Sequence, residues 1–262
     1  GRACPAPTGE WKGERVPAEA VSYKLIPVTD RFPDSQLDQK MKTFLAPYKH
    51  VVDSVNNYVI AYAPNAMNPG GTGEYANWTA DMALNCVQEQ LDSIHTADPA
   101  STLPKTVEIG IMNAGGIRQN LPQGDVSLGR MLSTFPFPNR FTLLELSGKD
   151  LLETLAIMAR RKGEPISAQV RVAIEPDWKF VNATYCGEPI DPERTYTIAT
   201  IDYLAQGNDD LRPLARGKIL WTDPRDVAIP IIGYIIEQTK LNMPMSADPA
   251  SRFVPAVHIL ER

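Results

Sequence analysis

The sequence predicts a compact mixed α/β protein. Apolar residues make up 43% of its 262 residues and charged residues 22%, which is typical of a globular chain with a sizeable core. The 23 prolines argue against an all-helical bundle and indicate many short elements joined by turns. Short apolar runs of strand type alternate with segments of helical periodicity, and this alternation is the pattern of a mixed α/β fold.

The charge balance narrows the range of partners. The chain has 26 Lys+Arg against 31 Asp+Glu, a net charge of −5, so it has no basic excess to attract nucleic acid or an anionic membrane surface. No apolar run approaches the roughly 20 residues that a membrane-spanning helix needs. We therefore expect no nucleic-acid partner and no transmembrane segment.

The chain is predicted to hold one domain after an extended N-terminal segment. Residues 1–35 are rich in Pro and Gly and are read as an extended lead-in. Residues 36–262 are read as a single domain, because no internal repeat, low-complexity tract or linker divides them. The first helix can be capped by Asp34 or Ser35, and Pro47 inside its pattern is expected to kink or divide it.

The later elements follow from apolar periodicity and from turn residues at their ends. Strands are predicted at residues 58–62, 107–112, 140–146, 170–174, 196–201 and 253–260. Helices are predicted at residues 77–94, 149–161 and 224–240, with a shorter one that Ser127 caps and that ends near Thr134.

Three cysteines and three histidines restrict the chemistry further. Cys4, Cys86 and Cys186 allow at most one disulfide and show no Cys-x-x-Cys spacing, which excludes a disulfide scaffold and a structural zinc site. Cys86 lies in an apolar helical stretch and is expected to be a small core residue. The histidines are isolated in the sequence, so surface or capping roles are favoured over metal ligation.

The first of three unusual strand ends is the block Asn-Ala-Gly-Gly-Ile-Arg. Gly115 and Gly116 let a backbone approach a ligand closely. Asn113 and Arg118 supply donors suited to phosphate or carboxylate oxygens. The alternative is a tight turn followed by a solvated arginine, and spacing alone does not decide between them.

The second unusual segment is an aromatic loop in which prolines flank Phe137 on both sides. A rigid loop aromatic makes a platform on which a flat ring can stack. The alternative is a phenylalanine folded back into the core, and the sequence alone favours this alternative.

The third strand end places Tyr203 before a Gly/Asn turn that carries two acids, Asp209 and Asp210. These acids could accept hydrogen bonds from sugar hydroxyls or simply shape the turn. Adjacent side chains must diverge, so one functional acid is expected rather than an acid/base pair.

Taken in this order, the segments resemble the C-terminal substrate-binding domain of the 5′-nucleotidase / UDP-sugar hydrolase / 2′,3′-cyclic phosphodiesterase family. The segments that carry the resemblance are Gly73–Asp81 (GEYANWTAD), Ile111–Arg118 (IMNAGGIR), Phe135–Phe137 (FPF), Leu144–Leu151 (LELSGKDL) and Asp202–Asp209 (DYLAQGND). The match covers roughly residues 36–260, and Asn-x-Gly-Gly-Ile-Arg is its most specific part. It implies a single α/β (α+β) domain of layered α/β/β/α type with a mixed sheet, and the motif loops gathered at one edge.

The resemblance also implies a nucleotide site. Two aromatics sandwich the base in that family, and the matching positions are Phe137 and Tyr203, the latter replacing a usual Phe. The family's Asn and Arg contact phosphate or ribose, and its acid after the Gly-rich turn binds ribose hydroxyls. The expected substrate-binding residues are therefore Asn113, Gly115, Gly116, Arg118, Phe137, Tyr203, Gly207 and Asp209.

Two departures bear on the ligand. Glu74 stands where members that bind nucleoside monophosphates carry an Arg before the second helix, so one phosphate contact is missing or inverted in charge. The usual Gly-Gly-Asp-Gly turn reads Gly-Asn-Asp-Asp at residues 207–210. Both changes weaken the case for an anionic ligand and leave room for a nucleoside, a differently placed phosphate or a degenerate site.

The largest departure is the missing half of the family's enzymes. In that family a separate N-terminal metallophosphoesterase domain cleaves the phosphate at two metal ions, and His50, His95 and His258 cannot build such a cluster. We therefore expect no catalytic residue, metal site or cofactor in this chain, with divalent metal ions held by a metallophosphoesterase domain or subunit. The chain alone is expected to be inactive.

The leading hypothesis is thus a domain that binds a nucleotide or nucleoside for a metallophosphoesterase partner. The alternative is a non-catalytic binding or scaffolding protein with a degenerate nucleotide site. Hydrolysis by this chain with Asp209 or Asp210 as base is disfavoured, because no nucleophile or metal accompanies them. The resemblance further implies an extracytoplasmic location, in the periplasm or at the cell surface with or without a lipid anchor, the leader having been removed.

Overall fold

The computed structural model describes residues 36–256 of the chain. The predicted lead-in at residues 1–35 and the end of the last predicted strand lie outside the described residues. The described residues divide into two units, residues 36–49 and residues 50–256. Helix α1 (Gln36–Asn56) begins in the first unit and ends in the second, and Pro47 lies inside it without dividing it.

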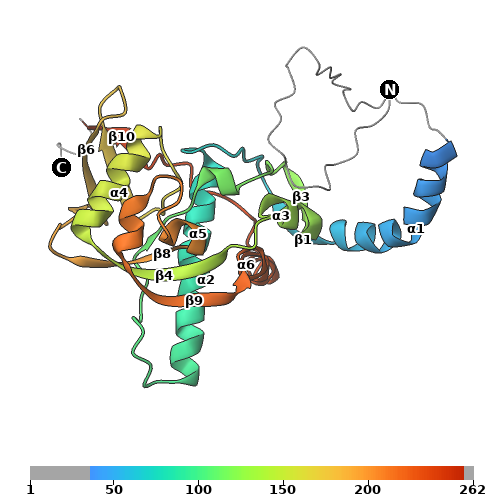
Figure 1. Ribbon diagram of the computed structural model, residues 1–262, viewed down its shortest axis with the longest axis horizontal. Helices are drawn as coiled ribbons and strands as arrows, with labels where there is room; N and C mark the ends of the chain where they lie inside the picture. Colours follow the sequence, from blue (N-terminus) through green and yellow to red (C-terminus); the bar gives the residue numbers. More distant parts are fainter. Residues whose placement is uncertain (1–35, 257–262) are drawn as a thin grey trace, which may run out of the picture. The chain divides into compact units, whose positions relative to one another are not determined.

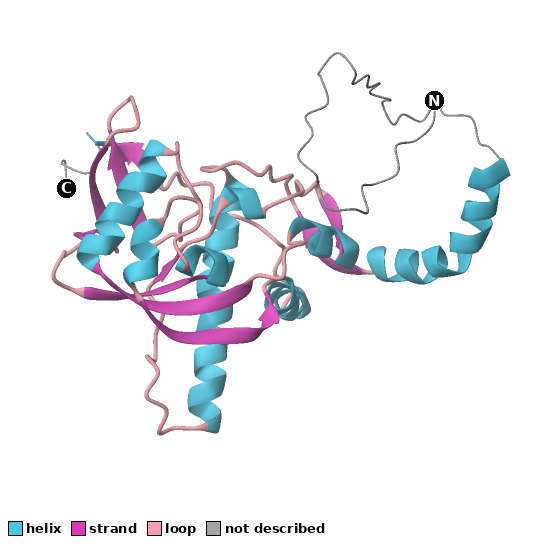
Figure 2. Ribbon diagram, in the orientation of Figure 1, coloured by secondary structure: helices cyan, strands magenta, loops and turns pink. Residues whose placement is uncertain are grey.

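The second unit is built on two four-stranded mixed sheets (Figures 1 and 2). The first sheet contains, in spatial order, β2 (Ile109–Gly110), β8 (Thr195–Ile201), β4 (Arg140–Ser147) and β9 (Lys218–Asp226). Strand β2 is parallel to β8, while β4 is antiparallel to both of its neighbours. The ends of β2 and β8 therefore point to the same edge of this sheet.

The second sheet contains, in spatial order, β10 (Phe253–Pro255), β5 (Val170–Ile174), β6 (Phe180–Tyr185) and β7 (Glu188–Pro189). Its first pair is parallel and the other two pairs are antiparallel. A separate antiparallel pair joins β1 (Val59–Ala63) to β3 (Gly124–Ser127).

Helices cover these sheets. The longer ones in this unit are α2 (Glu74–Ala97), α4 (Gly148–Arg160) and α6 (Ala228–Lys240), and the shorter ones are α3 (Leu128–Thr134), α5 (Asp202–Ala205) and the 3₁₀ turns η2 (Ala114–Gly116) and η3 (Arg212–Arg216). Helix α2 packs against β2, β8 and β4, and α4 contacts strands of both four-stranded sheets. The predicted mixed α/β class with mixed sheets is confirmed.

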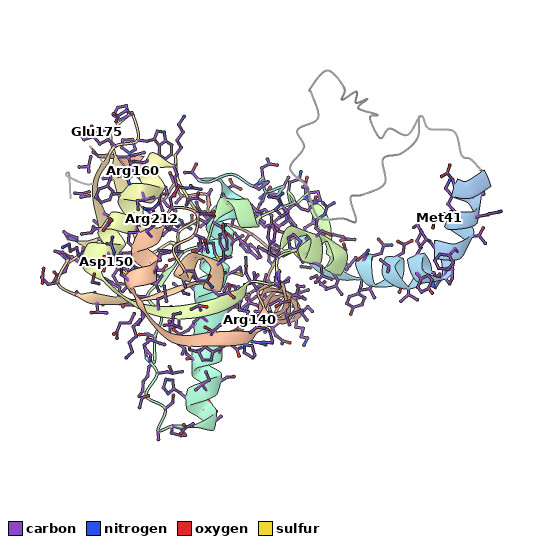
Figure 3. The ribbon with its side chains drawn as sticks, viewed as in Figure 1. Met41, Arg140, Asp150, Arg160, Glu175 and Arg212 are labelled. Atoms are coloured by element: carbon purple, nitrogen blue, oxygen red, sulfur yellow. The ribbon has the colours of Figure 1, made fainter. Side chains whose placement is uncertain are left out.

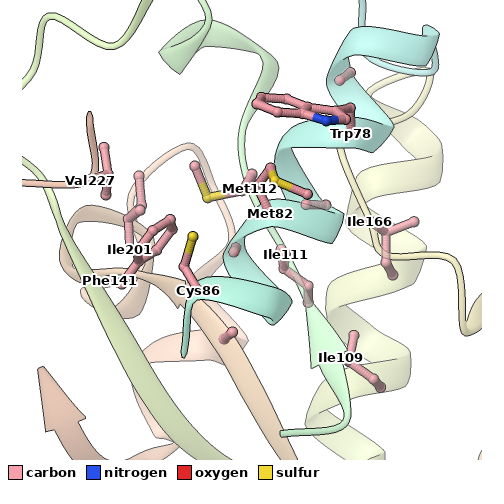
Figure 4. Packing of buried hydrophobic residues seen from close by; sticks show 14 of the residues in the cluster. Trp78, Met82, Cys86, Ile109, Ile111, Met112, Phe141, Ile166, Ile201 and Val227 are labelled. Atoms are coloured by element: carbon pink, nitrogen blue, oxygen red, sulfur yellow. The ribbon is translucent and has the colours of Figure 1, made fainter. Parts of the chain in front are cut away.

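The core lies where α2 meets the first sheet (Figure 4). Leu143 and Leu144 are adjacent in β4 and point to opposite faces, yet both are fully buried, so this central strand is covered on both sides. Cys86 on α2 is buried, as predicted, and burial raises the pKa of its thiol. The prediction that Ser127 caps a helix is also confirmed, since its Oγ accepts a hydrogen bond from the Arg130 N–H.

Several predicted boundaries are wrong. The last helix was expected to start at Pro224, but β9 runs through that residue to Asp226 and α6 starts at Ala228. A proline is tolerated there because β9 is the edge strand of its sheet. Helix α2 begins at Glu74 rather than at Asn77, and four strands were not predicted: β3, β6, β7 and β9.

Candidate functional site

The Asn-Ala-Gly-Gly-Ile-Arg block begins where the first sheet ends. Ile111 donates its backbone N–H to Ala199 of β8, and the chain then leaves the sheet through Asn113 into η2. The Asn113 side chain is buried, and its Nδ2 donates a 2.7 Å hydrogen bond to Asp209 Oδ2. Its Oδ1 is buried without a hydrogen-bond partner in the described part of the chain. This amide therefore keeps an unused acceptor inside the site.

Gly116 is required by the position of that amide. A β-carbon at residue 116 would lie 2.8 Å from Asn113 Oδ1, closer than real β-carbons approach. Gly115, which is exposed, lies on the same turn, with Asn113 Nδ2 at 3.8 Å from its would-be β-carbon. Gly116 thus lets the backbone pass close to the asparagine side chain, whereas a β-carbon on Gly115 would make only an ordinary contact.

The turn after α5 supplies the acid that Asn113 contacts. Gly207 has a φ of +81°, and the non-glycine residues Asp209 and Asp210 have φ of +54° and +61°. Such left-handed geometry is uncommon outside glycine and is often found at functional sites. It directs the Asp209 carboxylate toward Asn113 and that of Asp210 toward Arg161, so the two acids diverge as predicted.

Tyr203 is tied to the same acid. Its hydroxyl donates to Asp209 Oδ1 at 3.0 Å, so the two oxygens of Asp209 are bound by two different side chains. This hydrogen bond, together with the carboxylate charge, raises the pKa of the Tyr203 hydroxyl and keeps it a donor. The side chain remains 37% exposed, which leaves part of the ring accessible.

Phe137 lies on the surface rather than in the core. It is 43% exposed, whereas Phe135 of the same loop is buried. The guanidinium of Arg118 lies 5.8 Å from the centroid of the Phe137 ring, within range of a cation–π contact. Arg118 Nη1 also makes a long 3.4 Å hydrogen bond to the Gly115 carbonyl. The reading of Phe137 as a core residue is therefore wrong.

The structure assembles the predicted residues into two linked groups. Hydrogen bonds join Asn113, Asp209 and Tyr203, and a cation–π contact joins Arg118 to Phe137. The two groups share the block that contains Asn113 and Arg118. In the described chain the rings of Phe137 and Tyr203 do not contact each other.

Two residues of this region were not predicted from the sequence. Glu164 is buried, and its Oε2 accepts the backbone N–H of Ala114 at 2.9 Å. Its Oε1 accepts the Nε–H of Arg161 at 2.9 Å, and Arg161 Nη1 lies 3.7 Å from Asp210 Oδ2. The Arg161–Glu164 pair thus connects the asparagine block to the acidic turn. The one local signal was a glycine, Gly163, that turns the chain after α4.

The described side chains of this region do not provide a set of ligands for a metal ion. Within residues 36–256, no group of three or more His, Cys, Asp and Glu side chains is arranged to hold one. His95 Nε2 lies 3.2 Å from the Pro104 carbonyl, on the far end of α2, and His258 lies outside the described residues. No helix between residues 36 and 256 has both the length and the apolar character to cross a membrane.

Comparison with known protein families decides what kind of domain this is. A family model described as the 5′-nucleotidase C-terminal domain matches residues 57–216, more than half of the chain. The chain belongs to the 5′-nucleotidase C-terminal domain family. The matched range contains every predicted substrate-binding residue of this 5′-nucleotidase C-terminal domain as well as Arg161 and Glu164.

Individual relatives agree with this membership. Protein UshA of Escherichia coli is 32% identical over 106 residues, which cover 39% of this chain and 19% of UshA. The NAD 5′-nucleotidase of Haemophilus influenzae is 25% identical over 209 residues, covering 72% of this chain and 33% of that protein. A solved 5′-nucleotidase precursor from Thermus thermophilus shares the fold with a TM-score of 0.62 at 20% identity, over 82% of this chain and 43% of that one. The chain therefore spans less than half the length of these relatives.

Proposed function

We propose that this chain binds a nucleotide or nucleoside and positions its base and ribose for a metallophosphoesterase domain or subunit. The observation that supports this most is the hydrogen-bonded trio of Asn113, Asp209 and Tyr203 beside the exposed Phe137. It combines a fixed carboxylate with two half-exposed aromatic rings. A carboxylate suits the hydroxyls of a ribose, and aromatic faces suit a base.

Each side chain takes a part in this proposal. Phe137 and Tyr203 stack on the base, and Asp209 accepts hydrogen bonds from ribose hydroxyls. Asn113 holds Asp209 through Nδ2 and offers its unpaired Oδ1 to a ligand donor. Arg118, now above Phe137, moves to a phosphate oxygen when the ligand carries one. Gly115 and Gly116 form the turn around the Asn113 amide, and Gly207, with its positive φ, forms the turn that presents Asp209.

The chemical step belongs elsewhere in this proposal. The two metal ions that activate water for phosphate hydrolysis would be held by the metallophosphoesterase partner, since the described residues here offer no fitting donor set. The chain contributes binding and orientation, and we place it, with its partner, outside the cytoplasm.

Isothermal titration calorimetry tests the binding role. The purified chain is titrated with adenosine, AMP and UDP-glucose, and we expect saturable one-to-one binding of at least one of them. Phe137→Ala should weaken that binding, while Tyr62→Ala, which removes an exposed aromatic from β1, should not. Absence of binding by all three ligands would instead favour a scaffolding protein with a degenerate site.

A phosphate-release assay tests the division of labour. With Mn²⁺, Zn²⁺ or Mg²⁺ added, the chain alone should release no phosphate from AMP above background. Release at ordinary enzymatic rates, persisting through successive purification steps, would contradict the role assigned to the partner.

A further inference from the structure

Arg161 lies just after α4, and among the residues that the structure describes its close anchor is Glu164. Its Nε–H donates to the buried Oε1 of Glu164, whose side chain is 7% exposed. The second oxygen of Glu164 accepts the Ala114 N–H, so the anchor is itself fixed to the asparagine block. A guanidinium held through Nε keeps one N–H on each terminal nitrogen, the end-on pair, available to a second partner.

Those terminal nitrogens face a weakly held acid. Within the described chain, Arg161 Nη1 lies 3.7 Å from Asp210 Oδ2, and the Asp210 side chain is 75% exposed. Exposed ion pairs of this length contribute little to stability, so the contact is readily exchanged. The Arg161 side chain is itself 37% exposed, which leaves a path for a ligand.

Arg161 also lies at the predicted substrate site. Asp210 follows directly on Asp209, and the Arg161 charge opposes the effect of Asp209 on the pKa of the Tyr203 hydroxyl. The loop that leads into α2 touches the turn that follows α4, since a β-carbon on Gly71 would lie 2.3 Å from the Gly163 carbonyl oxygen. The first residue of α2, Glu74, stands where a cation was expected from the resemblance.

Burial disfavours the charged form of Arg161, but the hydrogen bond and charge of Glu164, followed by the charges of Asp209 and Asp210, raise its pKa above the ordinary value. The guanidinium therefore stays positive. Two fixed terminal N–H groups on a permanent cation form the fork that binds a phosphate oxygen pair.

We propose that Arg161 binds the phosphate of the nucleotide, exchanging its loose contact with Asp210 for the ligand while Glu164 keeps it in place. This inference rests on the proposed nucleotide-binding function and assigns to the residue that follows α4 the role of a cation that the start of α2 does not supply. It makes Asp210 a competitor of the ligand rather than a ligand-binding acid.

The test compares AMP with adenosine, because the two differ only in the phosphate. Arg161→Met should weaken the binding of AMP about tenfold and change the affinity for adenosine by less than about twofold. Arg160→Met is the matched control, since it removes the same charge from the preceding residue, the exposed last residue of α4 (Figure 3), and should leave the affinity for AMP unchanged. Asp210→Asn should strengthen the binding of AMP by about twofold to fivefold and leave the affinity for adenosine unchanged.

A second variant guards against loss of the fold. Arg161→Met leaves Glu164 without its cation, so the pair Arg161→Met/Glu164→Gln removes both charges and keeps an oxygen for the Ala114 N–H. It should show the same selective loss of AMP affinity. Unchanged affinity for AMP in either folded variant, or an equal fall for AMP and adenosine, overturns the role of Arg161 while the proposed function stands. Failure of the wild-type protein to bind any of AMP, adenosine and UDP-glucose overturns both.

Discussion

Two arginines of this domain each stand between two acids, and they use opposite ends of the guanidinium. Arg252 is fully buried, and its terminal nitrogens donate to Asp248 at 2.7 Å and to Asp81 at 3.1 Å. Arg161 is partly exposed, is held through Nε, and turns its terminal nitrogens to the solvent-exposed Asp210. The same residue types therefore build a structural cross-link in one place and an accessible cation in the other.

The surroundings explain this difference. Arg252 adjoins β10 and joins that strand to α2 through Asp81, whose other oxygen accepts the Ala168 N–H. The Nε of Arg252 is buried with no partner within the described residues, so the terminal nitrogens carry its whole interaction with acids. A buried charge held by two acids stabilises one arrangement of the chain, whereas a partly exposed charge with free terminal donors can bind a ligand.

Removing the buried arginine should have the largest effect on stability. Arg252→Met leaves two acids without their cation and is expected to lower the free energy of unfolding by about 3 kcal/mol, which corresponds to a fall in Tm of about 6–12 °C. Arg161→Met should lower it by less than half as much, because that site is open to water. Differential scanning calorimetry of both variants measures this, and equal losses would erase the distinction between the two arginines.

The next effect concerns ligand affinity rather than stability. Stacking of a base on an aromatic ring contributes about 1–3 kcal/mol to the free energy of binding, so Phe137→Ala should weaken the binding of adenosine about 5- to 150-fold. Its Tm should change little, because the ring is exposed. Calorimetric titration gives the affinity and thermal melting gives the stability. Adenosine bound as tightly by the folded variant as by the wild type would remove Phe137 from the site.

Arg118 offers a smaller and more selective effect. Arg118→Ala removes the cation above Phe137. It should therefore weaken the binding of AMP about tenfold and the binding of adenosine by less than about twofold. The AMP/adenosine affinity ratio is the measurement. If adenosine falls as far as AMP, Arg118 supports the ring of Phe137 instead of the phosphate.

The smallest expected effect is the pH dependence of the free energy of unfolding that comes from the acids around Arg252. The Ala250 N–H, followed by Arg252, holds the pKa of Asp248 below its ordinary value. A depressed pKa in the folded state contributes stability that is present above the unfolded-state pKa of about 4 and is lost as the pH falls through the folded value. Burial raises the pKa of Asp81 against the effect of Arg252, so protonation of Asp81 offsets part of that loss.

Asp248→Asn should therefore flatten the decline of unfolding free energy as the pH is lowered from about 5 to about 2. Urea unfolding at each pH, with the wild type in parallel, provides the measurement. An acid decline as steep as that of the wild type would show that Asp248 does not contribute to it.

Local sequence pattern predicted the elements whose surroundings are uniform. Strand β5 runs from Val170 to Ile174 as predicted, and β4 and β8 differ from their predictions by one residue. Strand β9 escaped prediction because, as an edge strand, it is mostly exposed and contains Pro224, which also resembles a helix start. Boundaries fixed by tertiary pairing leave little trace in the local sequence.

The site shows the same limit. Asn113, Arg118, Phe137, Tyr203 and Asp209 could be chosen from motifs and from family resemblance, and the structure joins them in two groups. Glu164 could not be chosen, because its partner Ala114 is fifty residues away in sequence and its segment looks like an ordinary helix end. Arg161 at a helix C-terminus is likewise explained locally by the helix dipole. Their roles depend on contacts that only the folded chain makes.

A crystal structure of the chain with adenosine tests the central claim most directly. We predict the adenine ring between Phe137 and Tyr203, with ribose hydroxyl oxygens at about 2.6–3.2 Å from the Asp209 carboxylate. Adenosine bound at another surface, with Asp209 still held only by Asn113 and Tyr203, would contradict it.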